Sequence, residues 1–165
     1  MNEEKEPNGI LVSGLELALR PADERDIGFC YELMSHNMRD LFDRNTPEKW
    51  SRAKFRSGFR PDRITIVEHE GMSVGFYDYE IVKAKWIYIH NLHLSKDYQT
   101  GVGTKIISRL IEQAARDHSV KAVIAKVFAE NLRLIRWLRM RGYNLGEKIE
   151  QENSYWVIKD LQEIQ

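Results

Sequence analysis

The spacing of hydrophobic residues changes several times along the chain, and each change predicts a new element. Apolar residues recur at steps of three and four over 27–41, which predicts a helix with one apolar stripe. The same spacing returns more strongly over 103–118 and predicts a longer amphipathic helix. Between these helices, the segments 64–69, 72–82 and 86–94 are rich in β-branched and aromatic residues and are separated by short polar turns. They predict three successive strands joined as hairpins.

Shorter segments complete the pattern. Thr46-Pro47 predicts the start of a helix that ends near Gly58, because threonine is a good cap and proline suits the first turn. Gly142 closes the helix predicted from Asn131, since glycine is common just after a helix end. The remaining strands are predicted at 15–19, 120–127, 143–149 and 155–158.

Together these elements predict an α/β fold of the α+β kind. We expect a mixed, mostly antiparallel sheet of about seven strands flanked by about four helices. Its centre is a strand–helix–strand unit at 86–127, in which the two strands run parallel through a right-handed crossover. Residues 1–14 are polar and include Pro7, Gly9 and Gly14. They are expected to form a disordered tail ahead of a single domain at 15–165.

Composition narrows the classes of function. The chain has 165 residues, and its 25 basic and 25 acidic residues give no net charge. Neutrality removes the general attraction on which nucleic-acid binders depend, so no nucleic-acid partner is expected. No apolar run approaches the ~20 residues of a membrane span, and the polar N-terminus lacks a signal-peptide core. With Cys30 as the only cysteine, the chain is expected to be cytoplasmic, without a disulfide or a membrane partner.

A glycine loop lies between the strand predicted at 86–94 and the helix that follows it. Gly101 and Gly103 allow the backbone to approach a ligand closely. The helix start offers unpaired N–H groups at the positive end of the helix dipole, which suits phosphate. Thr100 and Thr104 add hydroxyl donors. The loop is therefore a candidate anion site, although a glycine turn that only joins strand to helix remains open.

Two other phosphate motifs fit this loop poorly. A dinucleotide fingerprint needs a third glycine, but Ile106 holds that position. A P-loop needs lysine directly before serine or threonine, whereas Lys105 follows Thr104. A nucleotide-phosphate binder therefore stays an alternative of weak support.

Three segments resemble the GCN5-related N-acetyltransferase (GNAT) superfamily, and the resemblance extends from Leu17 to about Asp160. Leu19-Arg20-Pro21-Ala22, followed by Asp26, resembles its first strand and helix. The segment 89–104 resembles its acetyl-CoA motif. Asn131 through Trp137 to Gly142-Tyr143 resembles its later motif, in which an asparagine opens a helix that ends in glycine and an aromatic residue.

The resemblance implies acetyl-CoA as a co-substrate. The strand carrying residues 92–94 and the strand near Val127 should separate, and the pantetheine arm should lie in the gap. The arm should pair with the backbone of Leu92, His93 and Leu94. The pyrophosphate should lie on the backbone N–H groups of Gln99, Thr100, Gly101, Val102, Gly103 and Thr104. Asn131 should bind the arm or order the start of its helix.

The chain departs from the family pattern at three positions. The loop is one residue short, because Gln99 stands only two residues before Gly101 and Tyr98 takes the third place. Many members carry a tyrosine that protonates the leaving thiolate, and Leu138 occupies that position. Some members use a glutamate as the base, and Lys126 occupies that position. Neither catalytic role can be transferred by resemblance.

Candidate catalytic residues must then come from the neighbourhood of the thioester. His90 and His93 lie late in the strand at 86–94, and histidine has a suitable pKa for a general base. On a regular strand they would face opposite sides, which disfavours a metal site, but a family bulge could change this. Glu70 ends the strand at 64–69, at a hairpin tip expected near the glycine loop. Each residue has a plainer interpretation, as a partly buried histidine or a solvated strand edge.

Four arginines crowd the helix predicted at 131–141, namely Arg133, Arg136, Arg139 and Arg141. They could contact the 3′-phosphate of CoA or an acidic partner, or form a solvated helix face. Cys30 lies on the apolar stripe of the first helix and is expected to be a core thiol.

The predicted function is N-acetyl transfer from acetyl-CoA to a primary amine, by direct attack in a ternary complex. Neutral charge favours a small-molecule amine over a ribosomal or DNA-associated protein. The alternative is a non-catalytic acyl-CoA-binding module, which the leucine at position 138 supports. No metal is expected, and a homodimer is common in the family.

Overall fold

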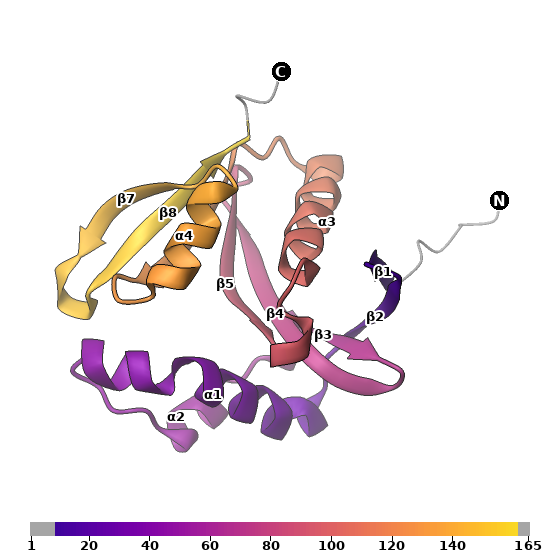
Figure 1. Ribbon diagram of the computed structural model, residues 1–165, viewed down its shortest axis with the longest axis horizontal. Helices are drawn as coiled ribbons and strands as arrows, with labels where there is room; N and C mark the ends of the chain where they lie inside the picture. The colour runs from indigo at the N-terminus through magenta and orange to yellow at the C-terminus, as the bar shows by residue number, and fades with distance from the viewer. Residues whose placement is uncertain (1–8, 162–165) are drawn as a thin grey trace.

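The computed structural model describes residues 9–161. Among them, eight strands form one sheet in the order β1-β2-β3-β4-β5-β6-β8-β7, and four α-helices pack around it (Figure 1). The strands are β1 (Gly9–Val12), β2 (Leu15–Pro21), β3 (Ile64–His69), β4 (Met72–Val82), β5 (Trp86–Leu94), β6 (Ala122–Phe128), β7 (Asn144–Ile149) and β8 (Ser154–Asp160). The helices are α1 (Ile27–Asn45), α2 (Arg52–Gly58), α3 (Val102–Asp117) and α4 (Leu132–Met140).

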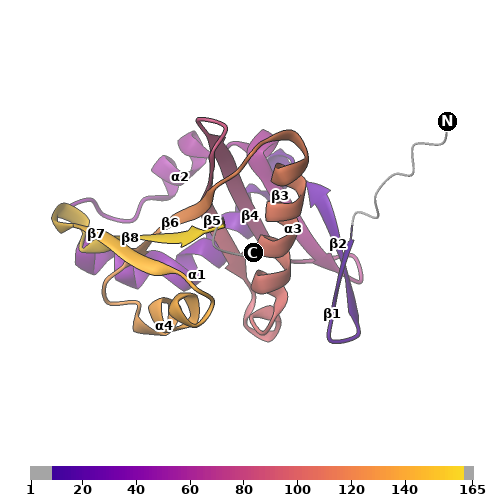
Figure 2. The ribbon, with the colours of Figure 1, turned by 90° about the horizontal axis from the view of Figure 1, so that it is seen from above.

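The predicted fold class is confirmed. Every pair of neighbouring strands is antiparallel except β5 and β6, which run parallel and are joined by α3. Alternating residues send side chains to opposite faces of the sheet. Ile66 and Phe76 pack with Cys30 and Leu33 of α1, whereas Tyr77 packs beneath α3. The helices α1 and α2 thus cover one face, and α3 and α4 cover the other (Figure 2).

The prediction of a disordered tail is wrong for residues 9–14. Gly9–Val12 pairs antiparallel with β2, through a tight turn in which Ser13 and Gly14 have positive φ angles of 49° and 82°. Val12 is buried in the core beneath α3. The glycines that indicated a loose segment instead flank a short apolar edge strand, which is why the sheet has eight strands. Residues 1–8 of the predicted tail lie outside the described residues.

The helix start predicted at Thr46-Pro47 is also wrong. Thr46 ends α1, where its hydroxyl donates to the carbonyl of Phe42 at 3.0 Å. The next helix begins at Arg52 and is capped by Ser51, whose hydroxyl accepts from the N–H of Lys54 at 3.3 Å. Threonine and proline occur both just after one helix and at the start of the next, so the local pattern did not show which of these positions Thr46-Pro47 holds. In the part of the chain that the structure describes, no helix is long and apolar enough to span a membrane.

Candidate functional site

The strands β5 and β6 separate after only three paired positions. Trp86, Ile87 and Tyr88 pair with the start of β6, and no pair joins the two strands beyond Tyr88 and Ile124 within the described residues. Parallel strands that diverge leave backbone N–H and C=O groups free along both inner edges. The separation expected from the resemblance is therefore present, and the second half of β5 is open to a ligand.

A cavity of about 320 Å³ occupies the gap between these strands. On the α4 side it is lined by Leu134, Trp137 and Leu138, and on the α1 side by Met34 and Met38. The cavity therefore passes through the divided sheet from one face to the other. Most of its wall is apolar, which suits the thioester end of an acyl-CoA.

The glycine loop stands at one end of this gap. Gly101 caps α3 with a φ of 80°, a left-handed conformation that glycine adopts without strain. A side chain on Gly103 would meet Leu92, Leu94 and Trp137 at 3.7–3.9 Å, so the backbone of this turn runs close to the wall of the gap. The first turn of α3 contains no acidic residue, which keeps its N–H groups and positive dipole available to an anion.

Two predicted cofactor ligands have their side chains engaged within the protein. Gln99 Nε2 donates to the carbonyl of Leu94 at 3.1 Å, so its amide closes the loop back onto β5. Asn131 caps α4, where its side-chain oxygen accepts from the N–H of Leu134 at 3.4 Å. Of the two roles expected for Asn131, the structure shows the ordering of its helix, and the residue also lines the cavity.

One extra residue interrupts the pairing of β5 with β4. Ile89 pairs with Tyr79 and Asn91 pairs with Asp78, so two steps along β5 match one step along β4. His90 is the additional residue. Such a bulge changes which face the following side chains occupy.

The bulge places both histidines on the α1 face, which corrects the expectation that they face opposite sides. His90 stacks on Tyr88 with 4.0 Å between ring centroids, and its Nε2 lies 3.1 Å from a carboxylate oxygen of Glu80. His93 pairs with Phe76, the residue that packs against α1. Glu80 and Phe76 are an even number of residues apart on β4 and therefore share a face.

The two histidines differ in burial. His93 is 8% exposed, and burial lowers its pKa to about 4, because an imidazolium is poorly solvated there. Its Nδ1 lies 3.4 Å from the amide nitrogen of Asn37 on α1. His90 is exposed and accessible from the cavity that it lines. His90 is thus the better placed of the two to exchange a proton with substrate or water.

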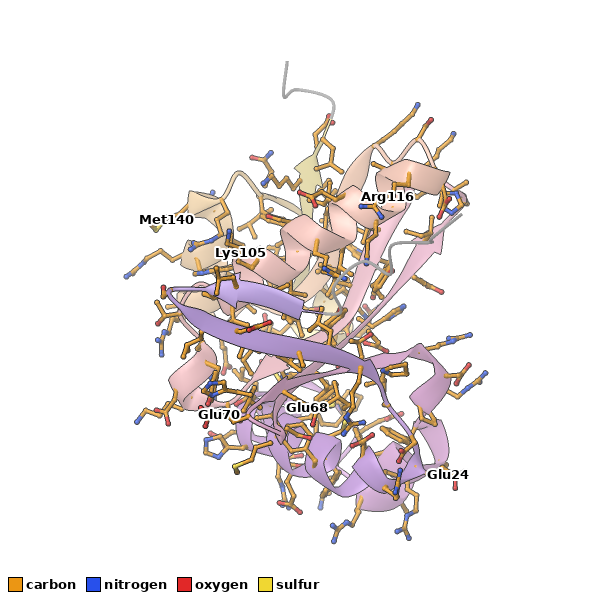
Figure 3. All side chains as sticks on the ribbon, turned by 90° about the vertical axis from the view of Figure 1, so that its right-hand side faces the viewer. Glu24, Glu68, Glu70, Lys105, Arg116 and Met140 are labelled. Atoms are coloured by element: carbon orange, nitrogen blue, oxygen red, sulfur yellow. The ribbon has the colours of Figure 1, made fainter. Side chains whose placement is uncertain are left out.

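Glu70, the third predicted catalytic residue, lies apart from the two histidines. It occupies the turn between β3 and β4 with a positive φ of 51°, its side chain is exposed, and it is not among the residues that line the cavity (Figure 3). The hairpin tip itself does reach the glycine loop as expected, since His69 Nδ1 lies 2.7 Å from the hydroxyl of Tyr98.

Asp78 and Lys126, the lysine at the family's base position, each have a partner within the protein. Burial raises the pKa of Asp78, whose carboxylate accepts from Asn91 at 2.9 Å. Lys126 lies 3.2 Å from Glu152 at the edge of the cavity. The lysine at this position is thus held in contact with a carboxylate.

Leu138, at the position where many family members carry a tyrosine, is apolar. It is buried in the cavity wall. Two hydroxyls, of Tyr143 and Ser154, are buried without a partner among the described residues, and both residues line the cavity. Burial raises the pKa of Tyr143 to about 12. Cys30 is fully buried with its pKa raised to about 12, which excludes it as an accessible nucleophile.

Several cavity residues were assigned by sequence to the core. Met34 and Met38 lie on the apolar stripe of α1, and their spacing alone gave no sign that they face a cavity. Trp50 also lines the cavity, whereas Phe55 packs with Phe59 and is not among the lining residues. Among the described residues, no group of histidine, cysteine and carboxylate side chains could hold a metal ion.

Comparison with known proteins agrees with this geometry. Residues 32–143 match the acetyltransferase (GNAT) family. No match was found among curated protein sequences. An acetyltransferase from Thermus thermophilus superimposes with a TM-score of 0.68 at 16% identity, covering 88% of this chain and 97% of its own.

Two further solved structures share the fold. The PaiA N-acetyltransferase from Thermoplasma acidophilum, in complex with coenzyme A, has a TM-score of 0.67 at 11% identity, covering 87% of this chain and 98% of its own. The ribosomal-protein-S18-alanine N-acetyltransferase from Escherichia coli has a TM-score of 0.61 at 16% identity, covering 88% and 94%. The chain therefore belongs to the acetyltransferase (GNAT) family, the family of acetyl-CoA-dependent N-acetyltransferases.

Proposed function

We propose that this protein transfers the acetyl group of acetyl-CoA directly to a primary amine of a small molecule. The observation that carries the proposal is the cavity that passes through the divided sheet. Acetyl-CoA would enter from the side of α3 and α4, and the amine from the side of α1. The two reactants then meet between β5 and β6 without a covalent enzyme intermediate, which the buried, inert thiol of Cys30 also disfavours.

The cofactor side of the gap supports this orientation. The diphosphate of acetyl-CoA would lie on the N–H groups of residues 99–104, and the pantetheine arm would pair with the open edge of β5 at residues 92–94. A backbone N–H of that edge would stabilise the oxyanion that forms when the amine attacks the thioester carbonyl. Such a donor is held rigidly by the pairing of β5 with β4.

Proton removal falls to His90 in this proposal. An alkyl ammonium has a pKa of ~10.4 and must lose a proton before it attacks. His90 is accessible at the cavity, and Glu80 at 3.1 Å orients its ring. His93 is a poorer base, since a pKa of about 4 gives it little affinity for a proton. The leaving thiolate would take its proton from water, because Leu138 offers none.

The acceptor side supports a small, partly apolar amine. Met34, Met38 and Trp50 line that end of the cavity. Two contacts join the C-terminal end of α1 to the opposite rim: Arg44 binds Glu130 at 3.0 Å, and Asn45 accepts from Asn153 at 2.9 Å. A rim closed in this way leaves less room for an extended peptide than for a small molecule.

An amine panel tests the proposed acceptor. We expect acetyl-CoA to raise the melting temperature of the protein, and CoA thiol to be released with small primary amines that carry an apolar group. Peptides with free N-termini, tested at the same concentration, are expected to react more slowly. Faster turnover of peptides than of every small amine would contradict the small-molecule assignment, while leaving acetyl-CoA binding intact.

The variant His90→Gln separates an enzyme from a non-catalytic acyl-CoA-binding module. We expect kcat to fall about 100-fold or more at neutral pH, as for loss of a general base, with the dissociation constant of acetyl-CoA unchanged. The matched variant His36→Gln alters an exposed histidine of α1 and should keep full activity. An unchanged kcat in His90→Gln would remove His90 from the mechanism, and no turnover by the native protein with any amine would favour the binding module.

A further inference from the structure

The four arginines of the α4 region are not equivalent. Arg133, Arg136 and Arg139 are exposed. Arg141 is half-buried, with its guanidinium 4.0 Å from the centroid of the Trp137 ring. It reaches across to α3, where its Nε donates to the hydroxyl of Thr104 at 3.0 Å, and its Nη1 donates to the carbonyl of Trp137 at 3.1 Å. Arg141 therefore stands at the wall of the gap, beside the first turn of α3.

This position is electrostatically unfavourable for a cation in the absence of a ligand. The N-terminus of a helix carries the positive end of its dipole, and the first turn of α3 holds Lys105 and no acidic residue. Within the described residues, no carboxylate pairs with Arg141. A fixed cation at such a site is stabilised when an anion binds between it and the helix.

The guanidinium keeps donors for that anion. Arginine has five N–H groups in a planar fork, and the two hydrogen bonds of Arg141 use one on Nε and one on Nη1. The remaining N–H groups can bind phosphate oxygens in pairs, a geometry that lysine cannot reproduce. The stacking on Trp137 and the bond to Thr104 fix the fork before the ligand arrives.

The glycine loop has its one amide side chain engaged within the protein. It is one residue shorter than the family pattern, and the side chain of Gln99 is turned back to the carbonyl of Leu94. We propose that Arg141 supplies a diphosphate contact of acetyl-CoA from α4, in compensation for the shortened loop. The proposal rests on the proposed function and assigns Arg141 to the diphosphate, because its tie to Thr104 places it beside the first turn of α3. Figure 3 shows Lys105 at that end of α3 and Arg116 at the other.

Three ligands distinguish the part of the cofactor that Arg141 contacts. They are acetyl-CoA, acetyl-CoA without its 3′-phosphate, and acetylpantetheine, which lacks the diphosphate and the nucleoside. In Arg141→Met, an apolar side chain retains contact with Trp137 but no donors. We expect dissociation constants, measured by calorimetry, to rise about 10- to 100-fold for the first two ligands and to stay unchanged for acetylpantetheine. Arg139→Met removes the same charge from the exposed face of α4 and should change none of the three.

Each other result overturns the proposal. Equal weakening of all three ligands would show that Arg141 only supports packing. Weaker binding of acetyl-CoA alone would assign Arg141 to the 3′-phosphate. Unchanged binding of all three ligands would show that Arg141 has no role in cofactor binding. If Arg141→Met fails to fold, Arg141→Lys replaces it and should show a smaller loss confined to the two diphosphate ligands. Failure of the proposed function looks different, because the native protein would then release no CoA thiol with any small amine, whatever its affinity for the three ligands.

Discussion

The extra residue in β5 changes the chemistry of the cavity. On a regular strand, His90 and His93 would face opposite sides of the sheet, because they are three residues apart. The bulge instead brings both to the α1 face, together with Glu80. Burial then separates them, since His93 is enclosed against Phe76 and His90 stays accessible. His90 thus supplies a polar group on the α1 side of the cavity, and His93 fills the core.

The buried His93 should make folding sensitive to mild acid. Its pKa is about 4 in the folded protein, against about 6.5 in an unfolded chain. The unfolded chain therefore binds a proton first as pH falls, and stability is lost between pH 6.5 and 4. We expect this group to lower the free energy of unfolding by about 3 kcal/mol over that interval.

Urea denaturation of the native protein and of His93→Leu at pH 7, 5.5 and 4 measures this effect. The variant should lose less stability than the native protein as pH falls. His36→Gln, which changes an exposed histidine, should follow the native protein. Equal losses in the native protein and in His93→Leu would show that His93 can be protonated without unfolding.

At the scale of elements, the loop between β5 and α3 is held from several directions. Tyr98 bonds to His69 at the tip of the β3–β4 hairpin. Val12 of β1 would lie 3.3 Å from a side chain on Gly101, and Arg141 binds Thr104 from the α4 side. The shape of the anion site therefore depends on segments far away in the sequence, although its own residues are consecutive.

Substitution at Gly103 tests the loop as the diphosphate site. A carboxylate from Gly103→Asp would lie against the bound diphosphate, so we expect acetyl-CoA to bind at least about 100-fold more weakly. Gly103→Ala is the matched control, because its methyl group would meet its neighbours at ordinary contact distances of 3.7–3.9 Å. Calorimetry measures the dissociation constant of acetyl-CoA for both variants. Equal affinity of the aspartate and alanine variants would show that the loop does not bind the diphosphate.

At the scale of the whole molecule, the proposed function places acetyl-CoA and the amine on opposite faces of a single sheet. A cavity lies where β5 and β6 separate. The helices α3 and α4 lie on one side of the sheet and α1 on the other (Figure 1). The contact between Asn45 and Asn153 ties α1 to the turn before β8. If the amine enters as proposed, acceptor selectivity should depend on how α1 and the β7–β8 turn approach each other.

Local patterns were sufficient for most of the architecture and for the cofactor loop. The period of the apolar residues indicated α3, α4 and the strands β3 to β6, because side-chain direction follows directly from helix and strand geometry. The glycines at 101 and 103, placed between strand and helix, indicated a candidate anion site, because a helix start offers unpaired N–H groups and the positive end of its dipole. By resemblance, Leu138 and Lys126 predicted that the usual acid and base are absent.

The remaining features depend on contacts between distant segments. The bulge at His90 exists only in the register of β5 against β4, and the strand at Gly9–Val12 forms only because β2 offers an edge. Burial lowers the pKa of His93, and the approach of α4 to α3 places Arg141 beside the first turn of α3. Pairing, burial and charge proximity are properties of the packed chain. Consecutive residues were therefore enough to predict a cofactor loop, whereas the residues proposed to complete it and to act on the amine emerged only from the tertiary structure.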